Sequence, residues 1–473
     1  MQTCDTLLHA GVLLTQDDDR RVLENAALAI DGGRIVALGC GRDVTAAWQA
    51  REILDLSGML VMPGLVNAHT HAAMTFLRGL ADDMPLMDWL QQKIFPVEQG
   101  QTPDLVRLGS LLGFAEMLRT GTTACVDMYI FEAAVLEAAD RAGLRCLAGE
   151  GVFNFPSACC PDADAALACT REMAQRWAGH DRLHVAVMPH SVYTTTAAQL
   201  TACRELADEL GLPLHIHLAE TRQETALSLQ QHGLRPVAHA DRLGLLRPGI
   251  ILAHVVDVDA DEMALLARRG VSVVHNPSSN MKLASGVAPV PTMLDAGVRL
   301  ALGSDGAASN NRLNMFTEMG RAALLHKAAG DPETMPARTV LDMATRGGAA
   351  GPGQRRRRPC RGPSRGLHRA GPFRAQHAAA VQCGLPRRLR GHRHGSGPDH
   401  GGGRGPVPRR PLQPLRLRGP VCGSARDAPL RPAPSGPARN GGLKPQPLRP
   451  ACRECPGRQQ GAAPGGDPVH GGT

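Results

Sequence analysis

The sequence lacks the features of membrane-spanning and secreted disulfide-rich proteins. No apolar run approaches the roughly 20 residues that a transmembrane helix needs. The amino-terminal segment has no basic region followed by an apolar core, so we expect no signal peptide. The eight cysteines of residues 1–350 follow no framework spacing and sit mostly among apolar residues, which favours reduced, buried thiols. We therefore predict a cytoplasmic protein without a membrane anchor.

The last quarter of the chain lacks the residues from which a core is built. Residues 351–473 contain no Ile, Met, Tyr or Trp, but they contain 23 Arg, 1 Lys and only 4 acidic residues, a net charge of +20. Such a segment cannot bury enough apolar area to fold, so we predict a disordered basic tail over residues 350–473. Because the rest of the chain is net acidic, the isoelectric point near 9.0 carries no information about a substrate.

The basic tail has two interpretations. An Arg- and Gly-rich arm can bind nucleic acid through its charge. Alternatively, a GC-rich gene read out of register yields this composition of Arg, Pro, Gly and Ala. We favour the second interpretation, and we do not expect nucleic acid to be a partner.

Two histidines follow a hydrophobic segment at the start of the remaining chain. Residues 60–66 are apolar and predict a strand, and His69 and His71 come soon after it. Because side chains alternate along an extended chain, the two imidazoles point the same way and form half of a zinc or iron site. A single such pair, taken alone, is more often two polar loop residues.

Three later apolar segments also end in side chains that can bind a metal. Residues 214–218, 250–253 and 298–302 carry or precede His217, His254 and Asp305. An Asp before a Gly is by itself more often a turn or cap residue. Because four strands each end in such a side chain, it is improbable that all of these residues are ordinary loop, turn or cap residues. Glu220 lies just beyond residues 214–218, within reach of a metal site. We interpret His215, inside that segment, as a packed core residue.

The spacing of these segments predicts an architecture. Eight apolar runs alternate with helical patterns, and a (β/α)8 barrel over residues 59–349 would gather the carboxyl ends of its strands at one catalytic face. The predicted strands are 60–66, 123–128, 145–152, 183–189, 214–218, 250–253, 271–274 and 298–302, and the predicted helices include 104–119, 163–177, 197–210, 260–269 and 311–327. Before the barrel, residues 6–14, 26–31 and 34–39 are predicted as short strands.

Several motifs together resemble the amidohydrolase superfamily, in particular its branch of 5-methylthioadenosine and S-adenosylhomocysteine deaminases. The resemblance covers about residues 1–349 and is carried by PGLVNAHTH (63–71), FPVE (95–98), PHSVYT (189–194), HIHLAET (215–221), HNPSSNMKLASG (275–286) and GSDGAASNN (303–311). The histidine pair and the aspartate indicate the superfamily, whereas FPVE and PHSVYT narrow it to the nucleoside-type deaminases.

The resemblance implies a metal site and a reaction. One divalent ion, Zn²⁺ or alternatively Fe²⁺, would be held by His69, His71, His217 and Asp305. The implied reaction is hydrolytic deamination of an adenosine-type nucleoside. The metal ion would supply the attacking hydroxide, because it lowers the pKa of its bound water towards neutrality. Glu220 would move the protons, His254 would orient the attacking hydroxide, and Asp305 would accept the second water proton.

Lysine is scarce, and this absence bears on the number of metal ions. Residues 1–349 contain only Lys93, Lys282 and Lys327, and none of them ends the fourth strand, which presents His190 instead. Many superfamily members bridge two metal ions with a carboxylated lysine at that position. A mononuclear site is therefore expected.

The resemblance also implies substrate contacts. Glu98 would accept hydrogen bonds from ribose hydroxyls, His190 would contact the ribose or base, and Trp89 would pack near the substrate. Without the resemblance, we would interpret Glu98 as a solvated carboxylate at a helix start, and Trp89 equally well as a core residue. Glu98 and His190 favour a substrate with a ribose, while Glu220 favours deamination over removal of chlorine. The alternative is an enzyme acting on guanine, cytosine or a chloro-triazine.

The family pattern is broken after the barrel. Residues 1–58 would form part of a small β-sandwich whose other strands follow the barrel, and those strands are missing here. A shifted reading frame of residues 375–410 can encode a segment that resembles them, which supports the out-of-frame interpretation. We expect a homo-oligomer where the sandwich is intact, and an unstable chain where it is not.

Overall fold

The computed structural model describes residues 1–328, 330–348 and 378–381, which all belong to one compact unit. The predictions for the basic tail, including its disorder and its reading frame, fall outside the described residues. The exception is the backbone of the short strand β14 (Ala378–Val381), which pairs with β4 in antiparallel fashion. Among the helices of the described residues, none is both long enough and apolar enough to cross a membrane.

The amino-terminal residues form a small sheet with the strand order β14-β4-β1-β2-β3. Its elements are β1 (Gln2–Leu14), β2 (Val22–Asp31), β3 (Arg34–Cys40), α1 (Gly41–Ala47) and β4 (Trp48–Pro63). The three predicted short strands are present, and the hairpin between β2 and β3 turns at Gly32 and Gly33, which both have positive φ. The long strand β4 was not predicted.

The predicted strand over residues 60–66 is wrong as a single element. Its first part belongs to β4 in the small sheet, and the barrel strand β5 (Leu65–Thr70) begins only after Gly64. A Cβ atom at Gly64 would lie 2.1 Å from the Thr123 hydroxyl, so the chain passes between the two sheets where only glycine fits. As a result His69 lies within β5, and His71 follows directly after it.

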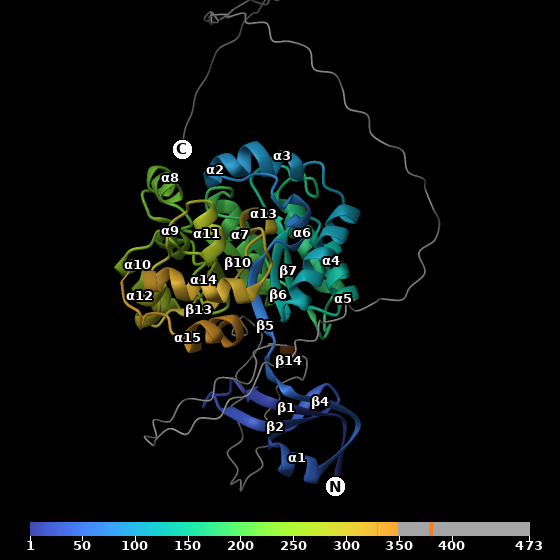
Figure 1. The fold of residues 1–473 in the computed structure, drawn as a ribbon. Coiled ribbons are helices and arrows are strands. Elements are labelled where there is room, and N and C mark those ends of the chain that lie inside the picture. Colours follow the sequence, from blue (N-terminus) through green and yellow to red (C-terminus); the bar gives the residue numbers. More distant parts are fainter. Residues whose placement is uncertain (329, 349–377, 382–473) are drawn as a thin grey trace, which may run out of the picture. The chain divides into compact units, whose positions relative to one another are not determined.

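Eight parallel segments form the predicted (β/α)8 barrel (Figure 1). After β5 they are β6 (Thr122–Tyr129), β7 (Arg145–Val152), β8 (Leu183–Val185) with β9 (Met188–Pro189), β10 (Leu214–Leu218), β11 (Ile250–His254), β12 (Ser272–His275) and β13 (Arg299–Leu302). Parallel bridges join Val187 to Leu214 and Ser191 to His217. The amide of Asp305 donates a 3.0 Å hydrogen bond to the His69 carbonyl and closes the ring.

The helices surround these strands, and most of those predicted are found within a few residues. They are α2 (Leu86–Trp89), α3 (Phe95–Glu98), α4 (Pro103–Arg119), α5 (Glu132–Ala142), α6 (Ala163–Arg176), α7 (Ala197–Leu210), α8 (Arg222–His232), α9 (Pro236–Arg242), α10 (Ala260–Arg269), α11 (Pro277–Lys282), α12 (Val290–Asp295), α13 (Ala307–Asn310), α14 (Met315–Ala328) and α15 (Ala337–Asp342), with short 3-10 and π turns at 72–77, 90–94 and 343–347. The predicted helix over 311–327 begins later, because Asn311 adopts a left-handed conformation that ends α13.

The interior of the barrel is a packed core. Side chains from six strands form one buried cluster: Ala68, Val126, Met188, Ile251, Val274 and Ala301. Packed interiors resist displacement, because interdigitated side chains leave few voids. The polar residues at the carboxyl ends of the strands are therefore fixed against a rigid floor.

Candidate active site

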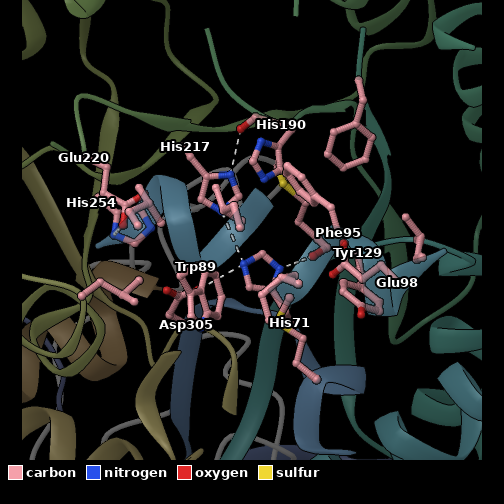
Figure 2. A pocket seen from close by; sticks show the side chains of 18 of the residues that line it. His71, Trp89, Phe95, Glu98, Tyr129, His190, His217, Glu220, His254 and Asp305 are labelled. Carbon is pink, nitrogen blue, oxygen red and sulfur yellow. Dashed lines mark hydrogen bonds and ion pairs between the residues drawn. The ribbon is translucent and has the colours of Figure 1, made fainter. Parts of the chain in front are cut away.

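Four candidate ligands meet at the carboxyl ends of the barrel strands, and Figure 2 shows three of them, His71, His217 and Asp305. Oδ1 of Asp305 lies 3.2 Å from Nε2 of His69 and 3.0 Å from Nε2 of His71. Nε2 of His217 lies 3.4 Å from Nε2 of His71. Strands that are far apart in the sequence therefore bring three histidine Nε2 atoms and one carboxylate oxygen to a common point.

The other ring nitrogen of each histidine has a partner. Nδ1 of His71 donates to the Met128 carbonyl, and Nδ1 of His217 donates to the His190 carbonyl at 2.8 Å. A carbonyl only accepts, so Nδ1 of both rings carries a proton and Nε2 of both rings faces the centre. Such bonds orient metal-binding histidines.

His69 is oriented by another histidine. Its Nδ1 lies 3.2 Å from Nε2 of His215, and both rings are fully buried. His215 is thus buried as predicted and is not among the converging ligand atoms. Its contact with His69 gives it an orienting position that the sequence did not reveal.

Asp305 is held from two sides. The hydroxyls of Ser279 and Ser309 donate to Oδ2 at 2.6 and 2.9 Å, which leaves Oδ1 for the histidines. Burial opposes ionisation, but the rings of His69 and His71, whose Nε2 atoms lie 3.2 and 3.0 Å from Oδ1, hold the pKa of Asp305 well below its usual range. The side chain is therefore an anion throughout the neutral range.

Backbone strain is concentrated at this end of the barrel. Ala219, His254 and Asp305 have φ values of 53°, 75° and 59°, in the left-handed region that non-glycine residues rarely adopt. Glu224 supports the first of these turns, because its carboxylate accepts the amide protons of Ala219 and Glu220 at 2.9 and 2.7 Å. Strain of this kind persists only where the surrounding structure enforces it, and it is common at active sites.

Glu220 and His254 lie beside the ligands. Nδ1 of His254 donates to Oδ1 of Asn280 at 2.8 Å and lies 3.7 Å from Oε1 of Glu220, which also accepts a 3.2 Å bond from Ser285. Burial raises the pKa of the Glu220 carboxyl. A carboxyl with a raised pKa is suited to accept and return protons near neutral pH.

The donor set fits a zinc ion. Ligand atoms of His69, His217, His254 and Asp305 all lie within 4.8 Å of one another, and Nε2 of His69 is buried without a hydrogen-bond partner. Imidazole nitrogens with one carboxylate oxygen are typical zinc ligands. His71 is outside this group, but its Nε2 is as close to Asp305 as that of His69.

A cavity of about 600 Å³ opens above these residues, and the three predicted substrate contacts all line it. The other residues around it are mostly apolar or aromatic: Met74, Leu86, Leu90, Ile94, Phe95, Met128, Tyr129, Ile130, Phe153, Tyr193 and Leu283. Trp89 is buried, as the core interpretation requires, yet its Nε1 donor has no partner among the described residues. It therefore combines a packed ring with an available hydrogen bond.

Two ionisable groups in the cavity wall have shifted pKa values. Burial raises the pKa of Glu98 to about 7, against the opposing effects of Tyr129 and His71. Burial and the neighbouring His71 lower the pKa of His190 to about 3, so this ring is neutral. Its Nδ1 lies 2.8 Å from the Thr194 hydroxyl. Glu98 is 8% exposed, which excludes the solvated interpretation.

Several supporting residues were missed by sequence reasoning. Ser279, Asn280 and Ser285 belong to residues 275–286. This segment contributed to the family resemblance, but none of its residues was given a role. Tyr129 lies at the end of a predicted strand and could have been suspected from its position alone. Glu224 gave no signal, since an acidic residue in the first turn of a helix is common.

The barrel and its cluster of histidines and aspartate define a metal-dependent hydrolase of the (β/α)8 type. A sequence model of the amidohydrolase family matches residues 60–351. The 5-methylthioadenosine/S-adenosylhomocysteine deaminase of Desulfovibrio desulfuricans is 64% identical over 351 residues, which are 74% of this chain and 80% of that protein. The chain belongs to the amidohydrolase family.

Two zinc-bound crystal structures share this fold. An adenosine deaminase from Xanthomonas campestris with bound zinc is 43% identical, with a TM-score of 0.72, and the match covers 74% of this chain and 80% of that one. Atrazine chlorohydrolase from Arthrobacter aurescens, complexed with zinc, is 25% identical with a TM-score of 0.67, covering 73% and 82%. The two neighbours thus carry different reactions on one barrel.

Proposed function

We propose that this chain is a zinc-dependent hydrolase that deaminates an adenosine-type nucleoside, S-adenosylhomocysteine or 5-methylthioadenosine, to the inosyl product and ammonia. The observation that carries the proposal is the position of Glu220, a buried carboxyl of raised pKa beside the histidine and aspartate cluster. The name of the Desulfovibrio desulfuricans relative supports the choice of substrate.

Residues 69, 71, 217 and 305 would hold one zinc ion, and iron is the alternative. When bound, the ion supplies a water whose pKa lies near neutrality. Glu220 takes a proton from the attacking water and delivers it to the ring nitrogen N1 as the amine-bearing carbon becomes tetrahedral. His254, held by Asn280, orients the water, and Asp305 accepts the second water proton and passes it to the amino group, which leaves as ammonia.

The cavity wall selects the substrate in this proposal. Glu98 in its ionised form accepts hydrogen bonds from the ribose hydroxyls, and neutral His190 contacts the ribose or base. The free Nε1 donor of Trp89 offers one more hydrogen bond. The aromatic residues of the wall supply flat apolar surface for the base and for the thioether group.

The alternative is a reaction on another heterocycle, such as guanine, cytosine or a chloro-triazine. The likeness to atrazine chlorohydrolase gives this alternative a structural precedent. Glu98 favours a nucleoside over these rings, because a buried carboxylate facing the cavity can accept hydrogen bonds from the two hydroxyls of a ribose. The presence of Glu220 favours deamination.

The test is a substrate panel with the zinc-loaded full-length chain. Ammonia release and the exchange of an amine for an oxygen, followed by mass spectrometry, are expected with S-adenosylhomocysteine, 5-methylthioadenosine and adenosine. Guanine, cytosine and atrazine serve as competitors, and the Glu220→Gln variant serves as the control. Turnover of atrazine or guanine ahead of all three nucleosides would contradict the proposal.

We also propose that the segment from residue 350 onward is read out of frame, so that residues 1–58 have lost the rest of their sandwich and the chain is unstable. We further propose that the protein is cytoplasmic and that it forms a homo-oligomer where the sandwich is intact. Sequencing genomic DNA across codons 340–360 tests whether the reading frame is shifted. An inserted or missing base is expected, and an intact frame would contradict it.

A further inference from the structure

Three cysteines and a glutamate gather away from the catalytic histidines. Glu150 lies at the end of β7, Cys159 and Cys160 lie in the loop after this strand, and Cys169 lies on α6. One carboxylate oxygen of Glu150 and the sulfurs of Cys159 and Cys160 are all within 4.8 Å of one another. Sγ of Cys169 lies 4.0 Å from Oε2 of Glu150. The sequence pattern assigned no role to any of these residues beyond buried, reduced thiols.

The three thiols also contact each other. Hydrogen bonds from Cys159 and Cys160 lower the pKa of the Cys169 thiol to about 4, whereas the contact with Cys159 raises the pKa of Cys160. A low-pKa thiolate is the form that binds metal ions.

The cluster is held in place by its surroundings. Both oxygens of Glu150 accept backbone amides at the start of α5, from Phe131 and Glu132, at 3.0 and 2.9 Å. The loop is closed by Ser157, whose amide donates to the Cys160 carbonyl at 2.9 Å and whose hydroxyl accepts the Cys160 amide at 3.0 Å. The Glu150 carboxylate and the backbone of Cys160 therefore have fixed positions before any ligand arrives.

We propose that Glu150, Cys159, Cys160 and Cys169 form a second metal site, for a thiophilic divalent ion of the zinc and cadmium class. Three sulfurs and one carboxylate oxygen make a tetrahedral donor set, and thiolates select such ions over magnesium or calcium. Sulfurs bound at about 2.3 Å to one ion lie about 3.8 Å apart, so Cys159 and Cys160 need to approach each other by at most about 1 Å, whereas Cys169, which lies outside the 4.8 Å group, has to move toward them. Binding releases the remaining thiol protons to solvent.

The position of the site gives it a consequence for the enzyme. Cys160 is buried, but Cys159 and Cys169 are only half-buried, so an ion can reach them from solvent. The same loop carries Phe153, which lines the main cavity, and Phe155, which lines a smaller cavity of about 250 Å³ beside it. An ion that ties β7, the loop and α6 together would stiffen this wall of the substrate cavity.

Cobalt titration tests the site independently of the proposed function. Co²⁺ bound by thiolates gives a near-ultraviolet charge-transfer band, and the histidine and aspartate cluster has no sulfur to produce one. After chelator treatment under reducing conditions, the full-length chain is expected to bind two Co²⁺ per chain and to show the band. Cys160→Ser and Cys169→Ser are each expected to lose the band and one equivalent of metal, while they keep the ion that supports nucleoside turnover.

Two controls make the result specific. Cys203→Ser removes a buried thiol outside the cluster, and the double variant C452S/C455S removes the paired cysteines of the tail; both are expected to keep the band. Absence of the band from the parent chain, its persistence in Cys160→Ser and Cys169→Ser, or its loss in the tail variant would overturn the proposal. An inactive enzyme with an intact band would count only against the proposed function.

Discussion

The residues of the histidine and aspartate cluster and the residues of the cavity wall are positioned in different ways. The cluster stands on strand ends, and each member is fixed by a buried partner, as His217 is by the His190 carbonyl and Asp305 is by Ser279. The wall stands on short helices and loops, where Trp89 and Glu98 come from α2 and α3. The barrel therefore fixes the candidate metal ligands, and in the proposed function the wall of short helices and loops selects the substrate. Both neighbours, a deaminase and a chlorohydrolase, hold zinc on this barrel although they act on different substrates.

The largest expected effect comes from removing proton transfer without disturbing the cluster. Glu220→Gln keeps the side-chain shape and the contact with Ser285 but cannot accept a proton. We expect kcat to fall by about 10² to 10⁴-fold, the range for a general acid–base group. Steady-state kinetics with metal analysis checks this. An unchanged zinc content with kcat within a few-fold of the parent would show that another residue moves the proton.

An intermediate effect is expected from the residue behind the cluster. His215→Ala removes the partner of His69 Nδ1 without touching the cavity. We expect metal affinity or kcat/KM to drop by about 10 to 100-fold, as for other groups that orient metal ligands. Zinc competition with a chromophoric chelator measures the affinity. His239→Ala, which removes a buried histidine on α9 away from the cluster, is the matched control and should leave the affinity unchanged.

The cavity wall predicts a pH effect. The pKa of Glu98 is raised to about 7, so the carboxylate gains a proton as the pH falls through that value. If the ionised form accepts the ribose hydroxyls, kcat/KM for a nucleoside decreases as the pH is lowered from about 8 to about 6, mainly through KM. Glu98→Gln should raise KM by about 10-fold or more and abolish this KM dependence. A Glu98→Gln variant with the parental KM profile would remove Glu98 from substrate binding.

The smallest effect is expected for the indole donor. Trp89→Phe keeps an aromatic ring in the wall but removes the unpartnered Nε1–H. We expect KM to rise by about 2 to 10-fold with kcat nearly constant, the value of one neutral hydrogen bond. Nucleoside kinetics measures it. If kcat falls while KM stays constant, Trp89 acts on the transition state and the division between the two regions is less sharp.

The sequence predicted the rigid region better than the wall. Strand-end residues such as His217 and Asp305 could be found because apolar runs mark buried strands and chemistry collects at their carboxyl ends. The boundary at Gly64 was missed because residues 60–66 were interpreted as one apolar run, although Pro63 and Gly64 interrupt it. The partners of the cluster could not be found, because only the tertiary fold identifies them. Ser279 and Glu224 are ordinary polar residues until the fold brings them to Asp305 and Ala219.

The most direct test is an anomalous-scattering map of crystals of the zinc-loaded protein. We predict a zinc peak bound by Nε2 of His69, His71 and His217 and by Asp305, at about 2.0 to 2.2 Å, with His254 beside it and not bound. The ligand atoms of His69, His217, His254 and Asp305 already lie within 4.8 Å of one another, so the competing arrangement is well defined. A peak bound by His254 in place of His71, or no peak between these side chains, would contradict the account.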